Sequence, residues 1–294
     1  MSGKFSILMN CYNCEKYLKE AIDSVYAQTF TNWEIIFVDN CSIDKSSEIA
    51  KSYGDKIKIY KTSNNIPLGE ARNFGLQYCD SEYLAFLDTD DIWFSKKLEK
   101  QFEIFENNSD VKMIYGGAIW IDEVGKKIGE RVPKESDDVF RQNLIQYDIN
   151  MQTVAIRNNI QVGFNNTHQF SPDFDLFMKI VSKYKVKVIS EPIVKYRKMV
   201  NSLTSKKIDR WWVETKETLD DIFQDQQLSE KYSDVKNLAY AKVQYYKAQY
   251  LISENRVREA REELKQYSYL NRVYKFLYLL SFSKTIWDLV HRFK

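Results

Sequence analysis

The first hundred residues alternate apolar runs with amphipathic segments, and this rhythm restricts the possible folds more than any other feature of the chain. Four short apolar runs are typical of buried strands, and they cover residues 5–9, 33–38, 56–60 and 83–87. The segments between them space their apolar residues as helices do, and they cover residues 16–28, 44–53 and 68–79. Strands and helices that alternate in this way form right-handed βαβ units, so the sequence predicts an α/β fold with a mostly parallel sheet flanked by helices.

Polar clusters come directly after three of these predicted strands. They are Asn10 to Asn13, Asp39 to Ser42 and Asp88 to Asp91. Ligands of parallel sheets bind beyond the carboxyl ends of the strands. We therefore expect the three clusters to converge on one binding site.

The third cluster places Asp88, Asp90 and Asp91 within four positions. Like charges this close repel one another, so a positive partner is expected among them. Two carboxylates at a strand end suit Mg²⁺ or Mn²⁺, which is usually held by one or two carboxylates together with substrate phosphates. Taken alone, the pattern fits a helix N-cap equally well, with Asp91 or Ser95 as the cap.

The other two clusters favour a ligand with a base and a phosphate group. Asp39 could accept hydrogen bonds from a nucleobase or a ribose, and Tyr12 could offer an aromatic face beside the amides of Asn10 and Asn13. Arg72 could supply a cation near a helix N-terminus, where anions are favoured, or could be an ordinary solvated charge. The chain has neither the Walker lysine motif nor G-x-G-x-x-G, so no glycine loop is expected to cradle phosphates.

Composition argues against several other classes of protein. A formal net charge of +2 over 294 residues does not suggest a nucleic-acid binder, and two histidines are too few for a multi-histidine metal site. Cys11 and Cys14 have the spacing of a redox motif, but free thiols in a reducing compartment are the expectation. The N-terminus lacks a signal segment, and the best apolar run, 276–282, is far shorter than the ~20 residues that span a bilayer. A cytoplasmic protein is expected.

Three stretches of the chain resemble the nucleotide-binding half of family 2 glycosyltransferases: MNCYNCEKYLKEAIDSVYAQTFTNWEIIFVDNCSIDKSSEI, NNIPLGEARNFGL and YLAFLDTDDIWFSKKLEKQ. The similarity runs from about Phe5 to Gln101 and is weaker but traceable to about Ser202. It implies the GT-A fold and the inverting transfer of a sugar from a nucleotide sugar. In that pattern Asp39 contacts the base, most often uracil, while Asp88 and Asp90 form the Asp-x-Asp pair at the ribose and at a Mn²⁺ or Mg²⁺ ion.

The resemblance also implies a catalytic base at the start of a helix on the acceptor side. Asp173 matches that base, and Asp175 is the alternative. Acidic residues are also ordinary in the first turn of a helix, as is Pro172, which stands where the family usually has Glu.

A second departure concerns the stretch Tyr196-Arg-Lys-Met199, where the family commonly ends in His. Met199 cannot help to hold a metal or a diphosphate as that His would. Lys195, Arg197 or Lys198 could supply charge instead.

The organisation of the chain follows from a change of pattern near residue 205. Residues 1–205 are predicted to form the catalytic domain, with 1–101 as its nucleotide-binding half and 102–205 as its acceptor half. Beyond it, long helical patterns with almost no Gly or Pro predict an all-helical region over 206–294, with a helical hairpin broken near Asn255.

Residues 272–294 carry five Lys or Arg and a single acidic residue, Asp288. The apolar residues predicted to share one helical face here are Phe282, Ile286, Leu289, Val290 and Phe293. A basic amphipathic helix of this kind could lie weakly on the inner face of the plasma membrane, partly through anionic lipid. It could also pack on the preceding helices or in a dimer.

The function predicted is transfer of a sugar, from a UDP-linked donor, to a hydroxyl of a glycan or a lipid-linked glycan in bacterial surface polysaccharide synthesis. A sugar nucleotidyltransferase is one alternative, but Phe5 to Leu18 contain no glycine for the loop such an enzyme would carry. A catalytically silent GT-A-like binding protein is another, and the departures at Pro172 and Met199 would fit it.

Overall fold

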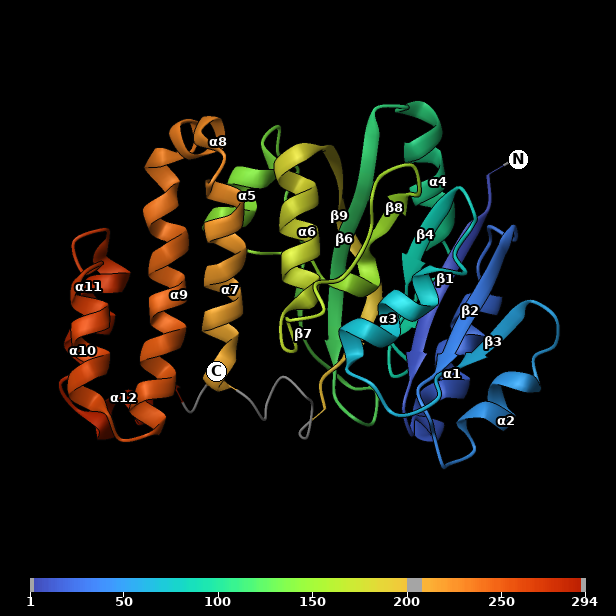
Figure 1. Ribbon diagram of the computed structural model, residues 1–294, viewed down its shortest axis with the longest axis horizontal. Coiled ribbons are helices and arrows are strands. Elements are labelled where there is room, and N and C mark those ends of the chain that lie inside the picture. The colour runs from blue at the N-terminus through green and yellow to red at the C-terminus, as the bar shows by residue number, and fades with distance from the viewer. Residues whose placement is uncertain (1–2, 200–207, 292–294) are drawn as a thin grey trace. The chain divides into compact units, whose positions relative to one another are not determined.

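Residues 3–199 and 208–291 are described by a computed structural model, in which the chain divides into two units (Figure 1). Unit 1 comprises residues 1–139 and 148–200, and unit 2 comprises residues 140–147 and 201–294. The segment 140–147 thus belongs to unit 2 although the chain on both sides of it belongs to unit 1. The boundary predicted near residue 205 lies outside the described residues.

A mixed sheet of nine strands forms the centre of unit 1 within the described residues, in the order β3-β2-β1-β4-β8-β6-β9-β5, with β7 paired to β6. The strands are β1 (Phe5–Cys11), β2 (Trp33–Asp39), β3 (Ile57–Lys61), β4 (Tyr83–Phe86), β5 (Ile92–Trp93), β6 (Val111–Ile121), β7 (Lys127–Arg131), β8 (Ala155–Arg157) and β9 (Lys185–Arg197). The first four strands pair in parallel as predicted, whereas β8 runs antiparallel to β4 and to β6. The parallel prediction is therefore right for the βαβ part of the chain, and the rest of the sheet is mixed.

The helices of unit 1 are α1 (Glu15–Tyr26), α2 (Ser46–Lys51), α3 (Leu68–Leu76), α4 (Lys97–Asn107), the short 3-10 helix η1 (Met151–Thr153) and α6 (Pro172–Lys183). Side chains alternate between the two faces of a strand. Ile7 and Met9 of β1 enter a buried core together with residues of α1 and α4. On the other face of β1, Leu8 meets α3 so closely that a Cβ on Gly75 would lie 2.4 Å from its Cδ1 atom. Figure 1 shows α3 and α6 in front of the sheet.

Strand β9 is 13 residues long. It runs parallel to β6 along the whole of Val111–Ile121 and also pairs antiparallel with β5, where Ile92 stands opposite Lys195. This pairing brings the end of β9 to the segment that follows β4. The end of β9 therefore lies beside residues that are about a hundred positions earlier in the sequence.

Unit 2 is helical throughout the part of it that the structure describes. Its helices are α5 (Val139–Ile145), α7 (Ile208–Phe223), α8 (Gln226–Lys231), α9 (Ser233–Ser253), α10 (Val257–Lys265), α11 (Arg272–Leu280) and α12 (Lys284–His291). An ion pair between Arg141 and Asp234 links α5 to α9. The predicted hairpin break is confirmed, because Asn255 lies between α9 and α10 in a left-handed conformation with φ of 64°.

The C-terminal segment forms two helices rather than the single one predicted. Ser281 ends α11 by donating its hydroxyl to the carbonyl of Tyr278, and Ser283 accepts the backbone N–H of Ile286 at the start of α12. Serine hydroxyls compete with helical hydrogen bonds in this way, which explains the interruption. Phe293, which was predicted to share the apolar face, lies outside the described residues. Over residues 3–199 and 208–291, every helix is too short or too polar to cross a bilayer.

Candidate functional site

The carboxyl ends of β1, β2 and β4 lie side by side, because β1 pairs with β2 on one side and with β4 on the other. Cys11 at the end of β1 stands opposite Asp39 at the end of β2. The backbone N–H of Leu87 donates to the carbonyl of Leu8 at 3.1 Å, which carries β4 on toward Asp88. The three polar clusters predicted from the sequence therefore lie together at the carboxyl ends of neighbouring strands.

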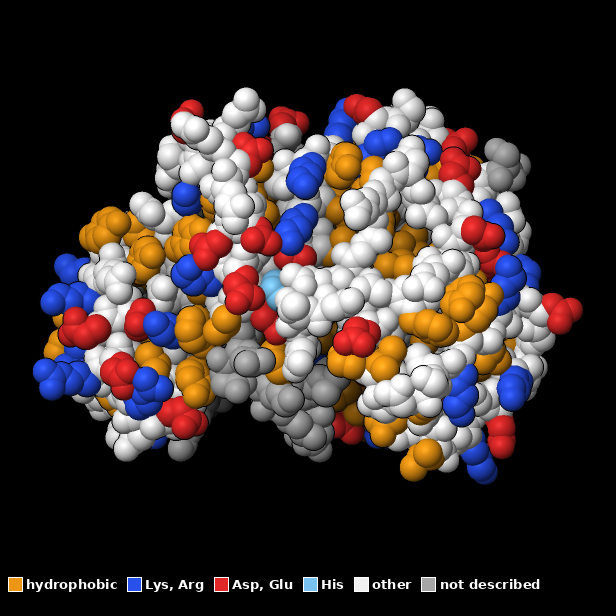
Figure 2. Space-filling view, in the orientation of Figure 1, with side chains coloured by type: hydrophobic (Ala, Val, Ile, Leu, Met, Phe, Trp, Pro, Cys, Tyr) orange, Lys and Arg blue, Asp and Glu red, His pale blue; other side chains and the backbone are white. Residues whose placement is uncertain are grey.

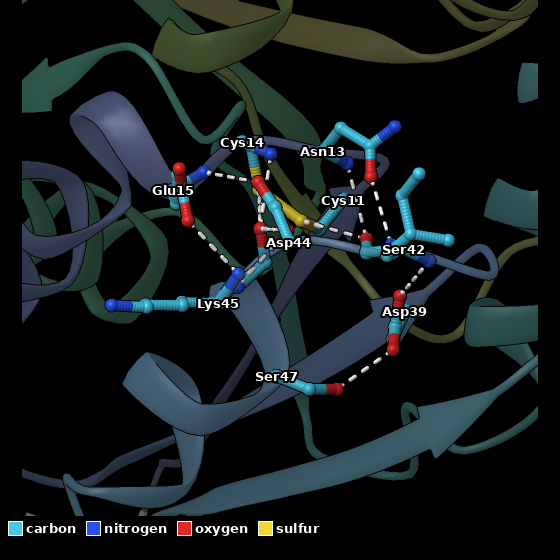
Figure 3. The surroundings of a disulfide bond; sticks show 11 residues. Cys11, Asn13, Cys14, Glu15, Asp39, Ser42, Asp44, Lys45 and Ser47 are labelled. Atoms are coloured by element: carbon cyan, nitrogen blue, oxygen red, sulfur yellow. Dashed lines mark hydrogen bonds between the residues drawn. A yellow bond between two sulfur atoms is a disulfide. The ribbon is translucent and has the colours of Figure 1, made fainter.

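A disulfide bond between Cys11 and Cys14 closes the loop after β1 (Figure 3). Asn13 has a left-handed backbone with φ of 53°, and this turn brings the Cα atom of Cys14 to 6.0 Å from that of Cys11. That separation lies within the range a disulfide requires. The expectation of free thiols is therefore wrong for this pair, while Cys41 and Cys79 are free.

The N-termini of α1 and α2 are tied to each other beside this loop (Figure 3). Asp44 accepts hydrogen bonds from the backbone N–H groups of Ser46 at 3.0 Å and of Glu15 at 3.0 Å. Glu15 in turn accepts the N–H of Lys45 at 2.9 Å. These contacts satisfy N–H groups that have no partner inside a helix, so the loops after β1 and β2 are held as one structure.

Asp39 is fully buried, and both of its carboxylate oxygens are already bonded within the loop after β2. One accepts the backbone N–H of Ser42 at 2.7 Å, and the other accepts the hydroxyl of Ser47 at 2.7 Å. Burial alone would raise the pKa of Asp39, but these hydrogen bonds lower it below its ordinary value. Each oxygen can accept one more hydrogen bond. A base could use that capacity only if the loop opened, and the predicted base contact stays a prediction.

The remaining residues of the first cluster differ in how available they are. The side-chain oxygen of Asn13 already has a hydrogen-bond partner, since it accepts the N–H of Ile43 at 2.9 Å. Tyr12 is 55% exposed. Both polar atoms of the Asn10 amide are buried without a hydrogen-bond partner among the described residues. A buried amide without partners is costly, so Asn10 and Tyr12 are the groups of this cluster that a ligand could satisfy.

The first carboxylate of the third cluster, Asp88, is held from two sides. Arg72 of α3 donates to one oxygen at 3.3 Å, and the side-chain amide of Gln152 in η1 donates to the other. Arg72 is itself buried, and its guanidinium lies 5.3 Å from the ring centroid of Phe164. Arg72 is therefore buried and ion-paired, and the alternative of a solvated helix charge is wrong.

The other two carboxylates of this cluster have different environments. Asp91 is completely buried and accepts the backbone N–H of Arg197 at 2.7 Å. Asp90 is partly buried, and burial together with the charge of Asp88 raises its pKa to about 6. Helix α4 has Lys96 at its N-cap position and no side-chain cap, so the N-cap interpretation of Asp91 and Ser95 is wrong.

Arg197 fixes the segment that carries these carboxylates. Its guanidinium donates to the carbonyl of Asp90 at 2.9 Å and forms an ion pair with Glu20 of α1 at 2.5 Å. The positive charge of Arg197 is therefore neutralised by a carboxylate of the protein itself. Lys198 is exposed and its ammonium lies 3.8 Å from the ring centroid of Trp120.

The described residues contain no group of three or more His, Cys, Asp or Glu side chains that could hold a metal ion. A cation at this edge of the sheet would depend on Asp90 and Asp88 together with oxygens of a substrate, which is how Mg²⁺ is often bound. Burial and the charge of Asp88 raise the pKa of Asp90 more than the charge of Arg197 lowers it, so the protein compensates this carboxylate only in part. The residues present therefore fit a cation that binds with a substrate, with Asp90 as its main protein ligand.

Asp173 and Asp175 both lie in the first turn of α6, but their surroundings differ. Asp175 is buried and forms an ion pair with Lys179 one turn along the helix, at 2.7 Å. Burial raises the pKa of Asp173, the positive charge of Arg72 opposes that rise, and the charge of Asp88 adds to it. Asp173 therefore lies within electrostatic reach of the Arg72–Asp88 pair, and its role as a base stays a prediction.

Two residues near these carboxylates were not among the predicted site residues. Gln152 belongs to no recognisable motif, and its place depends on the turn that Asn150 caps by accepting the Gln152 N–H at 3.1 Å. Tyr196 lies at the end of β9, where burial and then the charges of Asp91 and its neighbours raise its pKa. Tyr196 could have been predicted as a neighbour of the site, because it begins the stretch Tyr196-Arg-Lys-Met199 that resembles a family motif.

A family model described as "Glycosyl transferase family 2" matches residues 6–173. An uncharacterized glycosyltransferase of Methanocaldococcus jannaschii is 33% identical over 204 residues, which are 65% of this chain and 70% of that protein. The amylovoran biosynthesis glycosyltransferase AmsE of Erwinia amylovora is 29% identical over 185 residues, which are 60% of this chain and 70% of AmsE.

Two solved structures support the likeness at the level of the fold. S. aureus TarS in complex with UDP-GlcNAc superposes with a TM-score of 0.68 at 17% identity, over 96% of this chain and 82% of that one. The mannosyltransferase PcManGT of Pyrobaculum calidifontis, in complex with GDP-Man and Mn²⁺, superposes with a TM-score of 0.60 at 12% identity, over 97% of this chain and 86% of that one.

Proposed function

Because the chain belongs to glycosyl transferase family 2 and is related to polysaccharide biosynthesis enzymes, we propose that it transfers a sugar from a UDP-linked donor to a hydroxyl group with inversion at the anomeric carbon. The observation that carries the proposal is the arrangement of Asp88 and Asp90 beside the buried Arg72, at the carboxyl edge of a sheet with the GT-A fold. The negative charge of a nucleoside diphosphate is stabilised by basic side chains and by a divalent metal ion. Here Arg72 would supply the basic side chain, and Asp88 and Asp90 would hold the metal ion.

The donor would occupy the edge formed by the loops after β1, β2 and β4. Asn10 and Tyr12 have the free amide and the exposed ring that a nucleoside can use. Asn13 and Asp39 would shape this pocket, and Asp39 would reach the base after the loop that Ser42 and Ser47 now close has opened. The two solved structures hold UDP-GlcNAc and GDP-Man, and of these two nucleotides we propose UDP, which the resemblance of the sequence implies most often.

The diphosphate would lie against Arg72 and Asp90. Asp90, with Asp88, would hold Mn²⁺ or Mg²⁺, which would neutralise negative charge on the departing diphosphate. Arg72 supplies a second positive charge from a buried position, where electrostatic interactions are weakly screened. The hydrogen bond from Gln152 would hold the Asp88 carboxylate in place beside them.

Asp173 would act as the general base. It would take the proton from the acceptor hydroxyl while that oxygen forms a bond to the anomeric carbon and the bond from this carbon to the diphosphate breaks. Burial raises the pKa of Asp173, which makes it a stronger base than an exposed aspartate. Asp175 is the weaker candidate because Lys179 already neutralises it.

The acceptor would be a glycan or a lipid-linked glycan of a bacterial surface polysaccharide. AmsE belongs by its name to amylovoran biosynthesis, which supports this class of product. The enzyme would work in the cytoplasm, with weak peripheral contact to the inner face of the plasma membrane through residues 272–294. No nucleic-acid partner is proposed.

The test is isothermal titration calorimetry of the full chain with UDP, GDP, UDP-sugars and GDP-sugars, with and without Mn²⁺. We expect UDP-linked donors to bind in the presence of the metal, and Asp90→Ala to abolish the metal-dependent part while the protein stays folded. Asp55→Ala, which removes an exposed aspartate elsewhere in unit 1, is the matched control. Unchanged metal dependence in Asp90→Ala would place the cation elsewhere. Donor binding without transfer to any acceptor and without donor hydrolysis would favour a silent binding protein.

A further inference from the structure

Exposed apolar side chains are concentrated near the C-terminal end of unit 2. Sixteen large hydrophobic residues are exposed in the described chain, and eight of them fall between Tyr269 and Val290. Single exposed hydrophobic residues need no explanation, but a cluster marks a surface that binds something. Figure 2 shows apolar, basic and acidic side chains together at the surface over the end of unit 2 that carries α10 and α11.

The exposed residues form one side of each of the last two helices. On α11 they are Val273, Phe276 and Leu279, on α12 they are Ile286, Leu289 and Val290, and Phe282 lies between the helices. Both helices are anchored to the unit, because Leu280 and Trp287 are buried in a core with Ala248, Leu251 and Leu264. The exposed sides are therefore presented by helices that are already fixed to the unit.

Positive charge accompanies this apolar surface. Arg272 and Lys275 are exposed on α11, on the same side as Phe276, and have no ion-pair partner among the described residues. The guanidinium of Arg261 lies 4.0 Å from the ring centroid of Phe282. Asp288 is the only acidic residue from 269 to 291, and it is partly buried, away from the most exposed positions of α12.

We propose that the exposed sides of α11 and α12 form a docking surface for an anionic membrane. Apolar side chains would enter the region between headgroups and acyl chains, and Arg272 and Lys275 would contact the negative headgroups. A second copy of the chain fits less well. A two-fold contact places a patch against itself, so it would oppose the same cations across the interface.

The use of this surface rests on the proposed function, because a membrane contact serves transfer to a lipid-linked acceptor. Membrane binding itself does not require catalysis. It can therefore be measured apart from the chemistry of unit 1.

The experiment is co-sedimentation of the full chain with vesicles of phosphatidylcholine, with and without phosphatidylglycerol, at low and high salt. We expect binding to the anionic vesicles at low salt. Arg272→Glu/Lys275→Glu should weaken it by at least about 30-fold, which corresponds to the loss of two basic contacts. Phe276→Ser/Leu289→Ser should weaken binding at every salt concentration. Lys51→Glu/Lys134→Glu, a charge reversal of the same size at exposed lysines of unit 1, should bind as the wild type does.

Each protein is also melted and titrated with UDP, so that misfolding or a failure of the proposed function is seen separately. The proposal is overturned if the wild type ignores anionic vesicles at low salt, or if the Arg272→Glu/Lys275→Glu variant binds them normally. It is overturned as well if sedimentation velocity shows a dimer that Phe276→Ser/Leu289→Ser abolishes while vesicle binding persists.

Discussion

Unit 1 hides charged groups inside the protein, whereas unit 2 leaves apolar groups outside it. In unit 1, Asp39 and Asp91 have no exposed surface, and Arg72 is only 6% exposed. In unit 2, Phe276 and Leu289 are more than half exposed, on helices that Leu280 and Trp287 anchor to a buried core. Both arrangements cost free energy in an isolated chain, since a buried charge loses hydration and an exposed apolar side chain orders water.

This contrast agrees with the different partners proposed for the two units. A buried, partly compensated charge is relieved by a small ligand that brings the opposite charge, and such groups gather at functional sites. An exposed apolar surface is relieved by a large partner that excludes water. Changes in unit 1 should therefore alter nucleotide chemistry without altering vesicle binding.

The largest effect is expected from Asp173→Asn, which removes the proposed base and leaves the shape of the side chain nearly unchanged. Transfer should fall by roughly 10²–10⁴-fold, with little change in donor affinity, because a base acts on the acceptor in the transition state. Rates and donor titration measure the two quantities. Asp175→Asn is the comparison: should it be the variant that loses transfer, Asp175 would be the base. Vesicle binding should be normal in both.

An intermediate effect is expected from Gln152→Ala, which removes one of the two side-chain donors to Asp88. A hydrogen bond to a charged group contributes about 1.5–3 kcal/mol, so affinity for the metal-bound donor should fall by roughly tenfold to a hundredfold. Titration with UDP and Mn²⁺ measures this, and Gln77→Ala, at an exposed position of unit 1, is the control. Equal affinity in Gln152→Ala and wild type would remove Gln152 from the site.

The smallest effect is a gain in stability from Asp90→Asn in the absence of metal. The pKa of Asp90 is raised from 3.8 to about 6, so the folded protein binds this proton more tightly than the unfolded chain does. The stability of the wild type should therefore fall as the pH rises from about 4 to about 6 and stay level above that. Asp90→Asn cannot ionise at this position, so its free energy of unfolding does not fall in this way. Its melting temperature at neutral pH should be higher than that of the wild type, by about 2–4 °C for each kcal/mol of free energy of unfolding.

Thermal melts across this pH range test the expectation. Adding Mn²⁺ and UDP should reverse the order, because only the wild type gains from a bound cation. A variant that melts at or below the wild-type temperature at neutral pH without metal would contradict the idea that the protein compensates the charge of Asp90 only in part.

Much of unit 1 could be predicted from the sequence, because the relevant signals are local. The spacing of apolar residues marked the strands and helices of the first hundred residues, and a strand end followed by Asp88 and Asp90 marked the site. The break at Asn255 in unit 2 was predicted for the same reason. Such patterns depend on neighbours within a few positions, which the chain displays directly.

The distant groups of the candidate site could not be predicted, because their positions depend on how the chain packs. Gln152 reaches Asp88 across 64 positions, and Arg197 reaches Asp91 across 106 positions. The full length of β9 and the burial of Asp39 likewise depend on neighbouring segments. In unit 2, the sequence indicated an apolar, basic terminus, whereas the anchoring of α11 and α12 through Leu280 and Trp287 depends on packing against distant helices. Local periodicity determines which elements form, while the free energy of packing between distant segments determines which side chains meet.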